Sequence, residues 1–250
     1  MSRLFDTHCH LLAVQFNTDS GTSLILPSDI DFLSVGTEPK DWQNTLSLSK
    51  TYHQVSGAIG LHPWFVNDNY RLHLQSLEYL IVNNSTISAI GEIGLDFSSK
   101  FLPYKKQQLS VFEHQLRLAV QNDLPVSIHC YKAHNETLHL LNECAGFGFM
   151  HGFAGGSQMA KQFIKQGMLI GVNGVLLNPN ARRYHQMVQE IGLASLVLET
   201  DAPYGKNLPA SNPFDALLLI AEKVASLLSC SVDEVIDQTR YNAQQVLMRK

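Results

Sequence analysis

Histidines and carboxylates follow short apolar runs at widely separated places in this chain of 250 residues. Side chains so far apart in sequence can meet only if the apolar runs are parallel strands whose carboxyl ends converge. Imidazole and carboxylate groups together suit divalent metal ions. The pattern therefore predicts a metal-dependent hydrolase. The residues concerned are His8, His10, His62, Glu92, His129, His151 and Asp201.

The first of these groups lies in the segment Asp6-Thr7-His8-Cys9-His10. Residues two apart on an extended strand share a face, so His8 and His10 project together and Cys9 points the other way. One metal ion can bind both imidazoles, although two histidines in this pattern are also compatible with ordinary polar residues at a strand end. Asp6 either orients one imidazole, which is the interpretation we favour, or accepts hydrogen bonds from backbone donors.

Glu92 ends an apolar run in the segment Gly91-Glu92-Ile93-Gly94-Leu95-Asp96. A buried carboxylate needs a metal ion or a cationic partner to offset its loss of hydration. A salt bridge to Lys or Arg would satisfy Glu92 equally well, but the histidines elsewhere favour a metal-bridging role. We expect Asp96 to accept hydrogen bonds from loop amides.

Three further candidates each end an apolar run: His129, His151 and Asp201. A single buried histidine is more often an ordinary core residue than a ligand, but two at equivalent strand ends favour metal binding. We expect Asp201 to lie beside the histidines of the first run, as a third ligand or a general base. Glu199 lies two residues earlier and either faces inward as well or binds a loop or helix cap.

Apolar runs bounded by turn residues alternate with segments of helical periodicity along the whole chain. This alternation predicts one domain over residues 1–250, an α/β fold of the (β/α)₈ TIM-barrel type with its site at the carboxyl ends of the strands. A doubly wound open sheet is the alternative. The predicted strands are 3–9, 31–36, 55–61, 86–93, 124–130, 147–151, 168–173 and 195–200. The predicted helices are 38–52, 69–83, 104–122, 134–144, 157–166, 180–191, 211–229 and 232–248.

The net charge and the lengths of the apolar runs argue against some classes of protein. The formal net charge of −4, from 18 Lys and Arg against 22 Asp and Glu, argues against a broad basic surface for duplex nucleic acid. Bound divalent cations would still attract phosphate locally. Without a signal-like start or an apolar run of about 20 residues, we expect a cytoplasmic protein with reduced cysteines and no membrane partner.

At the residues discussed above, the chain resembles the TatD family of metal-dependent deoxyribonucleases, among the amidohydrolase-like metal barrels. The resemblance implies a site for two divalent ions, in which His8, His10 and Asp201 hold one ion, His129 and His151 hold the other, and Glu92 bridges them. The motifs that carry it are Asp6-Thr7-His8-Cys9-His10-Leu11, Gly60-Leu61-His62-Pro63, Gly91-Glu92-Ile93-Gly94-Leu95-Asp96, Pro125-Val126 through His129, His151-Gly152-Phe153 and Glu199-Thr200-Asp201-Ala202-Pro203-Tyr204.

The resemblance implies exonuclease-type hydrolysis of DNA ends. Two adjacent divalent ions can activate the attacking water, and we propose Glu92 and Asp201 as catalytic residues, with Asp201 accepting the proton of that water. The ligand types are compatible with Zn²⁺, Mn²⁺, Fe²⁺ or Mg²⁺. Two other enzyme classes are alternatives: an ester or amide hydrolase, such as an aminoacyl-tRNA deacylase, and a phosphoesterase with another small substrate. A barrel that only binds a partner is a third, non-enzymatic alternative. We expect nucleic-acid ends as partners and no obligate protein partner.

Three residues are candidate substrate contacts. The resemblance implies that His62 lies near the substrate, although it also fits a structural turn. The family usually carries Arg two residues after the histidine of the fifth strand, where this chain has Tyr131. Tyrosine can donate one hydrogen bond or stack on a base but cannot form the bidentate contact of arginine. Lys206 is another candidate cation, or else a solvated loop residue.

The rim residues Trp64 and Phe65 follow His62-Pro63. Their rings either cover the barrel core, which we favour, or stack on a base.

Overall fold

The computed structural model describes residues 3–16 and 24–248. Its eight strands are all parallel, and each pairs with the next in chain order. This order confirms the predicted (β/α)₈ barrel, because a doubly wound sheet reverses its strand order at a switch point. The strands are β1 (Leu4–Cys9), β2 (Ile30–Gly36), β3 (Val55–Ile59), β4 (Ile87–Asp96), β5 (Val126–Tyr131), β6 (Gly148–Met150), β7 (Met168–Val172) and β8 (Leu196–Leu198).

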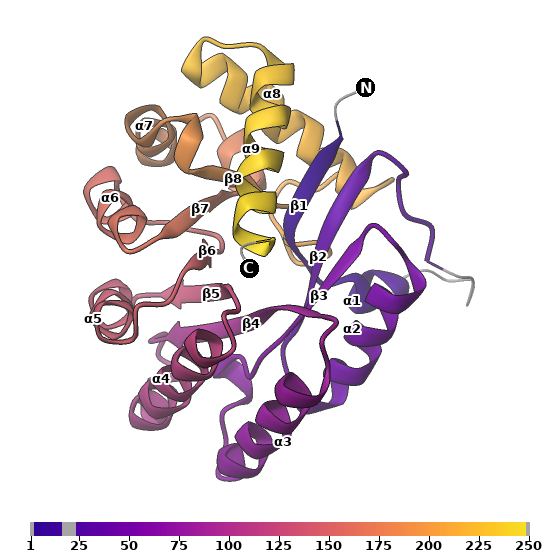
Figure 1. The fold of residues 1–250 in the computed structure, drawn as a ribbon. Coiled ribbons are helices and arrows are strands. Elements are labelled where there is room, and N and C mark those ends of the chain that lie inside the picture. The colour runs from indigo at the N-terminus through magenta and orange to yellow at the C-terminus, as the bar shows by residue number, and fades with distance from the viewer. Residues whose placement is uncertain (1–2, 17–23, 249–250) are drawn as a thin grey trace.

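Helices surround this ring of strands (Figure 1). The helices that were predicted from periodicity are all present, whereas the short helix after β1 was not predicted. The described α-helices are α1 (Leu11–Phe16), α2 (Pro39–Thr51), α3 (Tyr70–Asn83), α4 (Lys105–Gln121), α5 (His134–Cys144), α6 (Ser157–Lys165), α7 (Arg182–Ile191), α8 (Ala216–Leu228) and α9 (Val232–Leu247). Short 3₁₀ helices include η1 (Pro63–Phe65), η2 (Leu102–Tyr104) and η3 (Gly174–Leu177).

The last strand meets the first at the carboxyl end of the barrel. Thr7 Oγ1 donates a hydrogen bond to the Leu198 carbonyl oxygen at 2.9 Å. Beyond the end of β8, the backbone N–H of Asp201 donates to the His8 carbonyl oxygen at 2.9 Å. These bonds join the segments that carry His8 and Asp201. Closure of the barrel therefore brings the first and the last of the predicted site residues together.

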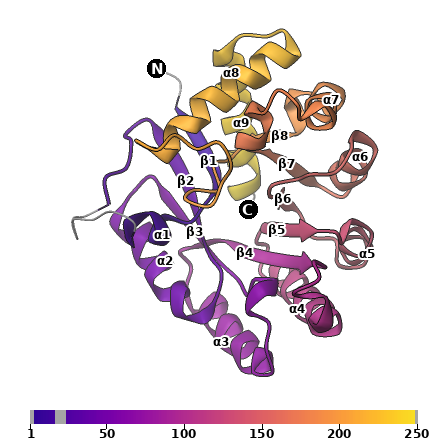
Figure 2. The same cartoon turned by 180° about the vertical axis from the view of Figure 1, so that it is seen from behind.

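The barrel interior and the opposite end are filled by apolar side chains. Ala243 of α9 packs against the inner residues, so α9 covers the amino ends of the strands. Accordingly, α9 lies in front in Figure 1 and is faded behind the barrel in Figure 2. The mouth at the carboxyl ends faces the viewer in Figure 2. The inner residues are Phe5, Leu33, Val35, Ala58, Ala89, Phe149 and Val197.

Local sequence signals also explain where the last helix begins. Ser231 Oγ accepts a hydrogen bond from the Glu234 backbone N–H at 3.2 Å, and Glu234 Oε2 accepts one from the Ser231 N–H at 2.8 Å. This reciprocal capping box satisfies donors that the first helical turn leaves free. It starts α9 at the position that the sequence predicted, and thereby fixes the helix that covers the barrel end.

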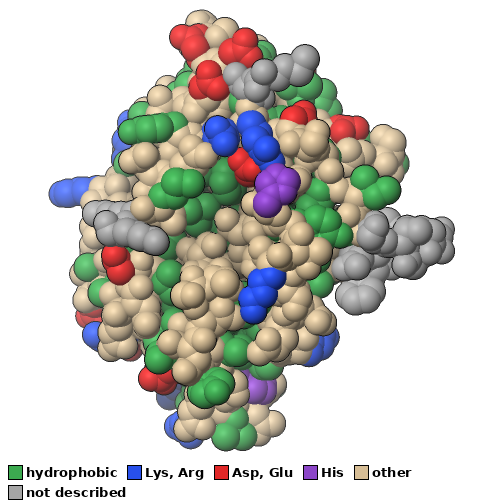
Figure 3. Space-filling model, turned by 45° about the vertical axis from the view of Figure 1, so that its right-hand side comes forward, with side chains coloured by type: hydrophobic (Ala, Val, Ile, Leu, Met, Phe, Trp, Pro, Cys, Tyr) green, Lys and Arg blue, Asp and Glu red, His purple; other side chains and the backbone are tan. Residues whose placement is uncertain are grey.

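The outer surface is mixed in character. On the face shown in Figure 3, Lys and Arg side chains are interspersed with acidic and apolar ones and do not form a continuous basic field. This distribution agrees with the net charge of −4. Among the residues that the structure describes, no helix is both long enough and apolar enough to span a bilayer.

Candidate metal centre

The predicted chemical side chains converge at the mouth of the barrel. Six of them line one pocket of about 720 Å³, and His8 lies fully buried beside Glu92. Apolar and aromatic groups, including Trp64 and Tyr204, form much of the remaining wall. The six are His10, His62, Glu92, His129, His151 and Asp201.

Irregular strand pairing aims two of these side chains inward. The β1 and β2 register shifts between Asp6 and Cys9, and the β4 and β5 register shifts between Ile90 and Ile93. A bulge of this kind changes which face a following residue occupies. Phe5 and His8 are three residues apart, yet Phe5 fills the barrel interior and His8 faces the carboxylate of Glu92. The shift in β1 therefore places His8 on the inner face.

Glu92 lies at the centre of the cluster, and each of its carboxylate oxygens faces two imidazoles. Its Oε2 is 3.4 Å from His8 Nε2 and 3.7 Å from His10 Nε2. Its Oε1 is 3.4 Å from His62 Nε2 and 3.3 Å from His129 Nδ1. Burial alone would raise the pKa of Glu92, but the neighbouring histidines hold it well below its usual range. The carboxylate is therefore ionised and shared.

Gly94 makes the close approach of β4 and β5 possible. Its φ of 137° lies in a region that side-chain-bearing residues rarely adopt, and a Cβ there would overlap the carbonyl oxygen of His129. The glycine two residues after Glu92 is thus needed for the strand that carries His129 to pair closely with β4.

Asp201 faces two histidines of the cluster, His10 and His151. Its Oδ1 is 3.5 Å from His10 Nε2, and its Oδ2 is 3.8 Å from His151 Nε2. The backbone of Asp201 is left-handed, with φ of 58°, and its carbonyl oxygen accepts hydrogen bonds from the N–H groups of Tyr204 and Gly205. Although burial opposes ionisation, the charge of His151 lowers the pKa of Asp201. A tight turn therefore holds an ionised carboxylate over the mouth.

Glu199 faces inward, as one of its two sequence interpretations proposed. It is fully buried, and its Oε1 accepts hydrogen bonds from the Gly152 N–H at 2.7 Å and Asn173 Nδ2 at 3.1 Å. The same oxygen lies 3.0 Å from His151 Nδ1. Burial lowers the pKa of His151, but Glu199 and Asp201 outweigh it and raise that pKa to about 10. Glu199 thereby orients His151 with its Nε2 toward the pocket.

We favoured Asp6 as the residue that orients an imidazole, and this prediction is wrong. Instead of facing an imidazole, its Oδ1 accepts hydrogen bonds from the N–H groups of His8 at 3.2 Å and Thr200 at 3.0 Å, and its Oδ2 accepts one from Thr200 Oγ1 at 2.6 Å. It ties β1 to the end of β8. The partner of His8 Nδ1 is Ser127 Oγ at 2.9 Å, a residue that the sequence analysis missed. Its position two residues before His129, on the same strand face, was the available signal.

Asp96 accepts a hydrogen bond from a loop amide, as predicted, because the Ser98 N–H donates to its Oδ1 at 2.8 Å. Its Oδ2 also accepts a 2.6 Å hydrogen bond from Trp64 Nε1 and lies 3.4 Å from His129 Nε2. We expected Trp64 to cover the barrel core, and this prediction is wrong. Its side chain lies on the pocket wall, and the residue is 52% exposed. Phe65 does pack against the core.

The three predicted substrate contacts lie in different places. His62 is buried against Glu92, and its Nδ1 accepts a hydrogen bond from the Trp64 N–H at 3.2 Å. Tyr131 and Lys206 are exposed and lie outside the lining of the pocket. The lysine that lines the pocket is Lys40, whose Nζ pairs with a glutamate oxygen at 2.6 Å.

The donor set fits divalent metal ions. Within each of three groups, the possible ligand atoms lie within 4.8 Å of one another. Neighbouring ligand atoms of a tetrahedral zinc site lie roughly 3.3–3.4 Å apart, given bonds of about 2.0–2.1 Å, close to the separations around Glu92. Burial lowers the pKa of His62 to about 4, so this imidazole is neutral; because its Nδ1 accepts from the Trp64 N–H, its Nε2 carries the proton and faces Glu92. The groups are His8 with His10 and Glu92, His8 with His151 and Asp201, and His62 with Glu92 and His129.

Two of these groups share Glu92, and two share His8. His129 is grouped with His62, and His151 with Asp201, so the pairing of His129 with His151 on one ion stays a prediction. The buried Nε2 of His8 forms no hydrogen bond within the described part of the chain. A metal ion beside Glu92 would satisfy this nitrogen.

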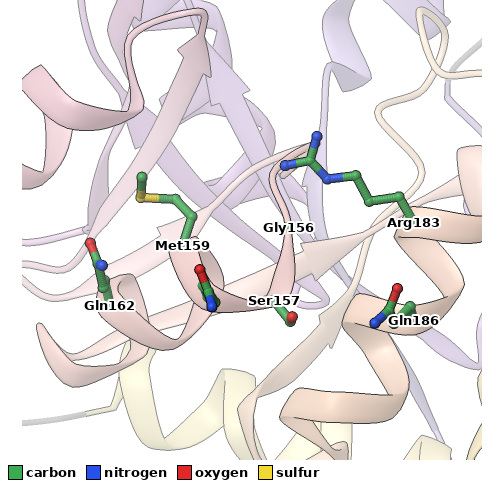
Figure 4. A pocket seen from close by; sticks show the side chains of 7 residues that line it. Gly156, Ser157, Met159, Gln162, Arg183 and Gln186 are labelled. Atoms are coloured by element: carbon green, nitrogen blue, oxygen red, sulfur yellow. The ribbon is translucent and has the colours of Figure 1, made fainter.

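A second hollow, of about 420 Å³, lies between α6 and α7 (Figure 4). Arg183 extends from α7 over Gly156 at the start of α6. The residues lining it include no histidine, cysteine, aspartate or glutamate. The hydrolytic chemistry therefore belongs to the mouth of the barrel.

Comparison with known proteins agrees with this geometry. A model of the family described as TatD-related DNase matches residues 5–248. The chain belongs to this family. The TatD relative YjjV of Escherichia coli, an uncharacterized metal-dependent hydrolase, is 33% identical over 207 residues, which cover 80% of each chain. Its crystal structure superposes with a TM-score of 0.84 at 27% identity and covers 99% of this chain and 98% of that one.

A further TatD relative is the 3′-5′ ssDNA/RNA exonuclease TatD of Erwinia amylovora. It is 28% identical over 256 residues, covering 96% of this chain and 98% of that protein. The family match, together with the grouped histidines and carboxylates, makes the chain a metal-dependent hydrolase of the TatD family.

Proposed function

We propose that this TatD-family hydrolase is a deoxyribonuclease that removes nucleotides from DNA ends. The observation that carries the proposal is the position of Glu92, whose two oxygens each face a pair of histidines. Such sharing supports two adjacent cations, the arrangement that serves in-line displacement at phosphorus in many nucleases and phosphatases. The name of the Erwinia relative supports the same substrate class.

The candidate ligands are those assembled around Glu92 and Asp201. When bound, divalent ions would acidify a water molecule and neutralise charge on the phosphate oxygens. Glu199 and Ser127 hold His151 and His8 in fixed orientations, so the ligand set requires little rearrangement.

Asp201 is our candidate for the general base. Its carboxylate lies at the open mouth beside His10 and His151, is ionised, and is positioned by a tight turn of the backbone. We propose that it accepts the proton of the attacking water and returns it toward the leaving oxygen. Lys40 lines the same pocket, and we propose that its Nζ, which pairs with Glu38 at 2.6 Å, also binds an incoming phosphate group.

The test is hydrolysis of end-labelled single-stranded DNA by protein stripped of metal and reloaded with Mg²⁺, Mn²⁺ or Zn²⁺. We expect stepwise shortening that Asp201→Ala abolishes. Asp215→Ala, at an exposed position in the short 3₁₀ helix Pro213–Asp215 before α8, is the matched control and should retain activity.

The aminoacyl-ester alternative is tested with the same preparations. Release of an amino acid from an aminoacyl ester, without shortening of DNA by the metal-loaded protein, would contradict the nuclease proposal. Loss of that release in Asp201→Ala would then assign deacylation to this same site.

A further inference from the structure

Two exposed aromatic rings and one partly buried ring lie at the mouth between the ends of β3 and β5, strands that lie beside β4 in Figure 2. Trp64, in η1 after β3, stacks on Phe101 from the loop after β4, with ring centroids 5.5 Å apart and planes 12° apart. Tyr131, at the end of β5, is 47% exposed. Contact between large apolar rings and water is unfavourable, and a flat partner that covers the rings removes it, so this surface is suited to such a partner.

These rings are connected to the metal centre. Asp96 holds the Trp64 indole by a 2.6 Å hydrogen bond, and the same oxygen faces His129. Tyr131 is the pairing partner of Asp96 across β4 and β5, which places it next along the rim. The Trp64 and His129 rings are 6.1 Å apart. A group stacked on Trp64 would therefore lie directly beside the candidate ligands.

Two lysines accompany the rings. Lys100 Nζ lies 4.8 Å from the centre of the Phe101 ring, and Lys132 Nζ lies 5.4 Å from that of Tyr131. The connecting segments 97–104 and 131–133 contain these lysines and no acidic residue. Aromatic faces next to cations, on a protein that is acidic overall, favour a partner with flat rings and negative charge.

We propose that this aromatic rim, formed by Trp64, Lys100, Phe101, Tyr131 and Lys132, binds a single strand of nucleic acid and guides its end to the metal centre. The inference rests on the proposed nuclease function. Bases can stack on these rings when they are unpaired, whereas two lysines are few for a duplex, whose binding depends on the neutralisation of many phosphates. Stacking on Tyr131 takes the place of the bidentate phosphate contact that an arginine there would make.

Binding is measured with the metal-loaded protein and phosphorothioate oligothymidylates of one to six nucleotides, which resist cleavage. The chain has two tryptophans, and the second, Trp42, is 1% exposed and bonded to the Gly60 carbonyl oxygen. Quenching of exposed tryptophan fluorescence therefore reports on Trp64. We expect quenching, and affinity that increases from one to about four nucleotides.

The variants give separate readouts for stacking and charge. Trp64→Ala is expected to weaken tetranucleotide binding by about 5- to 150-fold, and Trp64→Phe to recover most of that loss. Lys100→Ala and Lys132→Ala should each reduce the slope of log affinity against log salt by about 0.7. Tyr79→Ala and Lys161→Ala are matched controls: they change an exposed aromatic residue of α3 and an exposed lysine of α6 and should alter neither quantity.

Affinity that does not depend on length, or quenching that is absent although the oligonucleotide binds, would overturn the proposed rim. DNA shortening by the wild type with unchanged binding in Trp64→Ala would leave the nuclease proposal standing and refute the inference. Length-dependent binding that requires Trp64, without any hydrolysis, would support the rim and refute the nuclease.

Discussion

Loading of the metal-free protein with Zn²⁺ is expected to release a proton from His151. This imidazole lies 3.0 Å from Glu199 Oε1 and 3.8 Å from Asp201 Oδ2, and the two carboxylates raise its pKa to about 10 against the effect of burial. A metal ion binds the neutral imidazole, so the proton must leave when the site is filled.

The size of the effect follows from this pKa. At pH 8 a histidine with a pKa of about 10 is roughly 99% protonated, whereas an ordinary histidine is only about 3% protonated. Filling the site at pH 8 should release about one proton per chain from His151 alone. The apparent metal affinity should rise roughly tenfold per pH unit between about pH 7 and pH 10 because proton and metal compete for this group.

Calorimetric titration of Zn²⁺ in two buffers of different ionisation enthalpy measures the number of protons released. Glu199→Gln is the matched variant, because it keeps the size of the side chain and removes the charge that contributes most to the raised pKa of His151. Its proton release at pH 8 should be smaller than that of the wild type. Release of less than about half a proton by the wild type, or equal release by the variant, would refute the role assigned to the Glu199 and His151 pair.

The stability of the metal-free protein should depend on pH for the same reason. Since the pKa of His151 is raised on folding, its contribution is fully present below about pH 6.5 and is lost as pH rises through about 10. Chemical denaturation at pH 7 and pH 10 should show this loss, and Glu199→Gln should reduce the difference.

Three further outcomes test other parts of the structure. Asp201→Asn, compared with the wild type at equal metal content, should lower turnover by about 10²- to 10⁴-fold, and full turnover would refute its role as the base. Gly94→Ala should destabilise the protein by at least about 2 kcal/mol in urea unfolding, because its methyl group meets the His129 carbonyl oxygen. Gly192→Ala is the comparison for backbone strain without steric overlap: its φ of 71° and ψ of 171° also strain alanine, but its surroundings are open, so a loss of roughly 1–3 kcal/mol, smaller than that of Gly94→Ala, is expected. Ser231→Ala should cost about 1 kcal/mol through loss of the capping box, and an unchanged melting temperature would contradict that.

Much of the barrel could be predicted because its signals are local. Apolar runs such as that before His129, and the periodic face of α4, depend on neighbouring residues alone, and the structure contains both elements. Helix starts are similarly local, as the Ser231 capping box shows. The convergence of the site residues then followed from parallel strands, whose carboxyl ends must lie at one end of a barrel.

Other features of the site depend on contacts between segments far apart in sequence. Asp6 bonds Thr200 and the His8 backbone rather than an imidazole, and Trp64 turns outward because Asp96 accepts its indole N–H. Side-chain type alone does not distinguish these partners, since a carboxylate accepts equally well from a backbone amide, a hydroxyl or a ring N–H.

The sequence by itself determined the order of strands and helices and the identity of the candidate metal ligands. Only the tertiary structure decided how those ligands are grouped. The register shifts in β1 and β4 turn His8 and Glu92 inward, and Glu92 then meets four histidines, which come from the ends of β1 and β5 and from the turn before η1. Strand alternation is a property of each strand, whereas register is set by hydrogen bonds with the neighbouring strand, so the face and spacing of these groups are fixed only when the barrel closes.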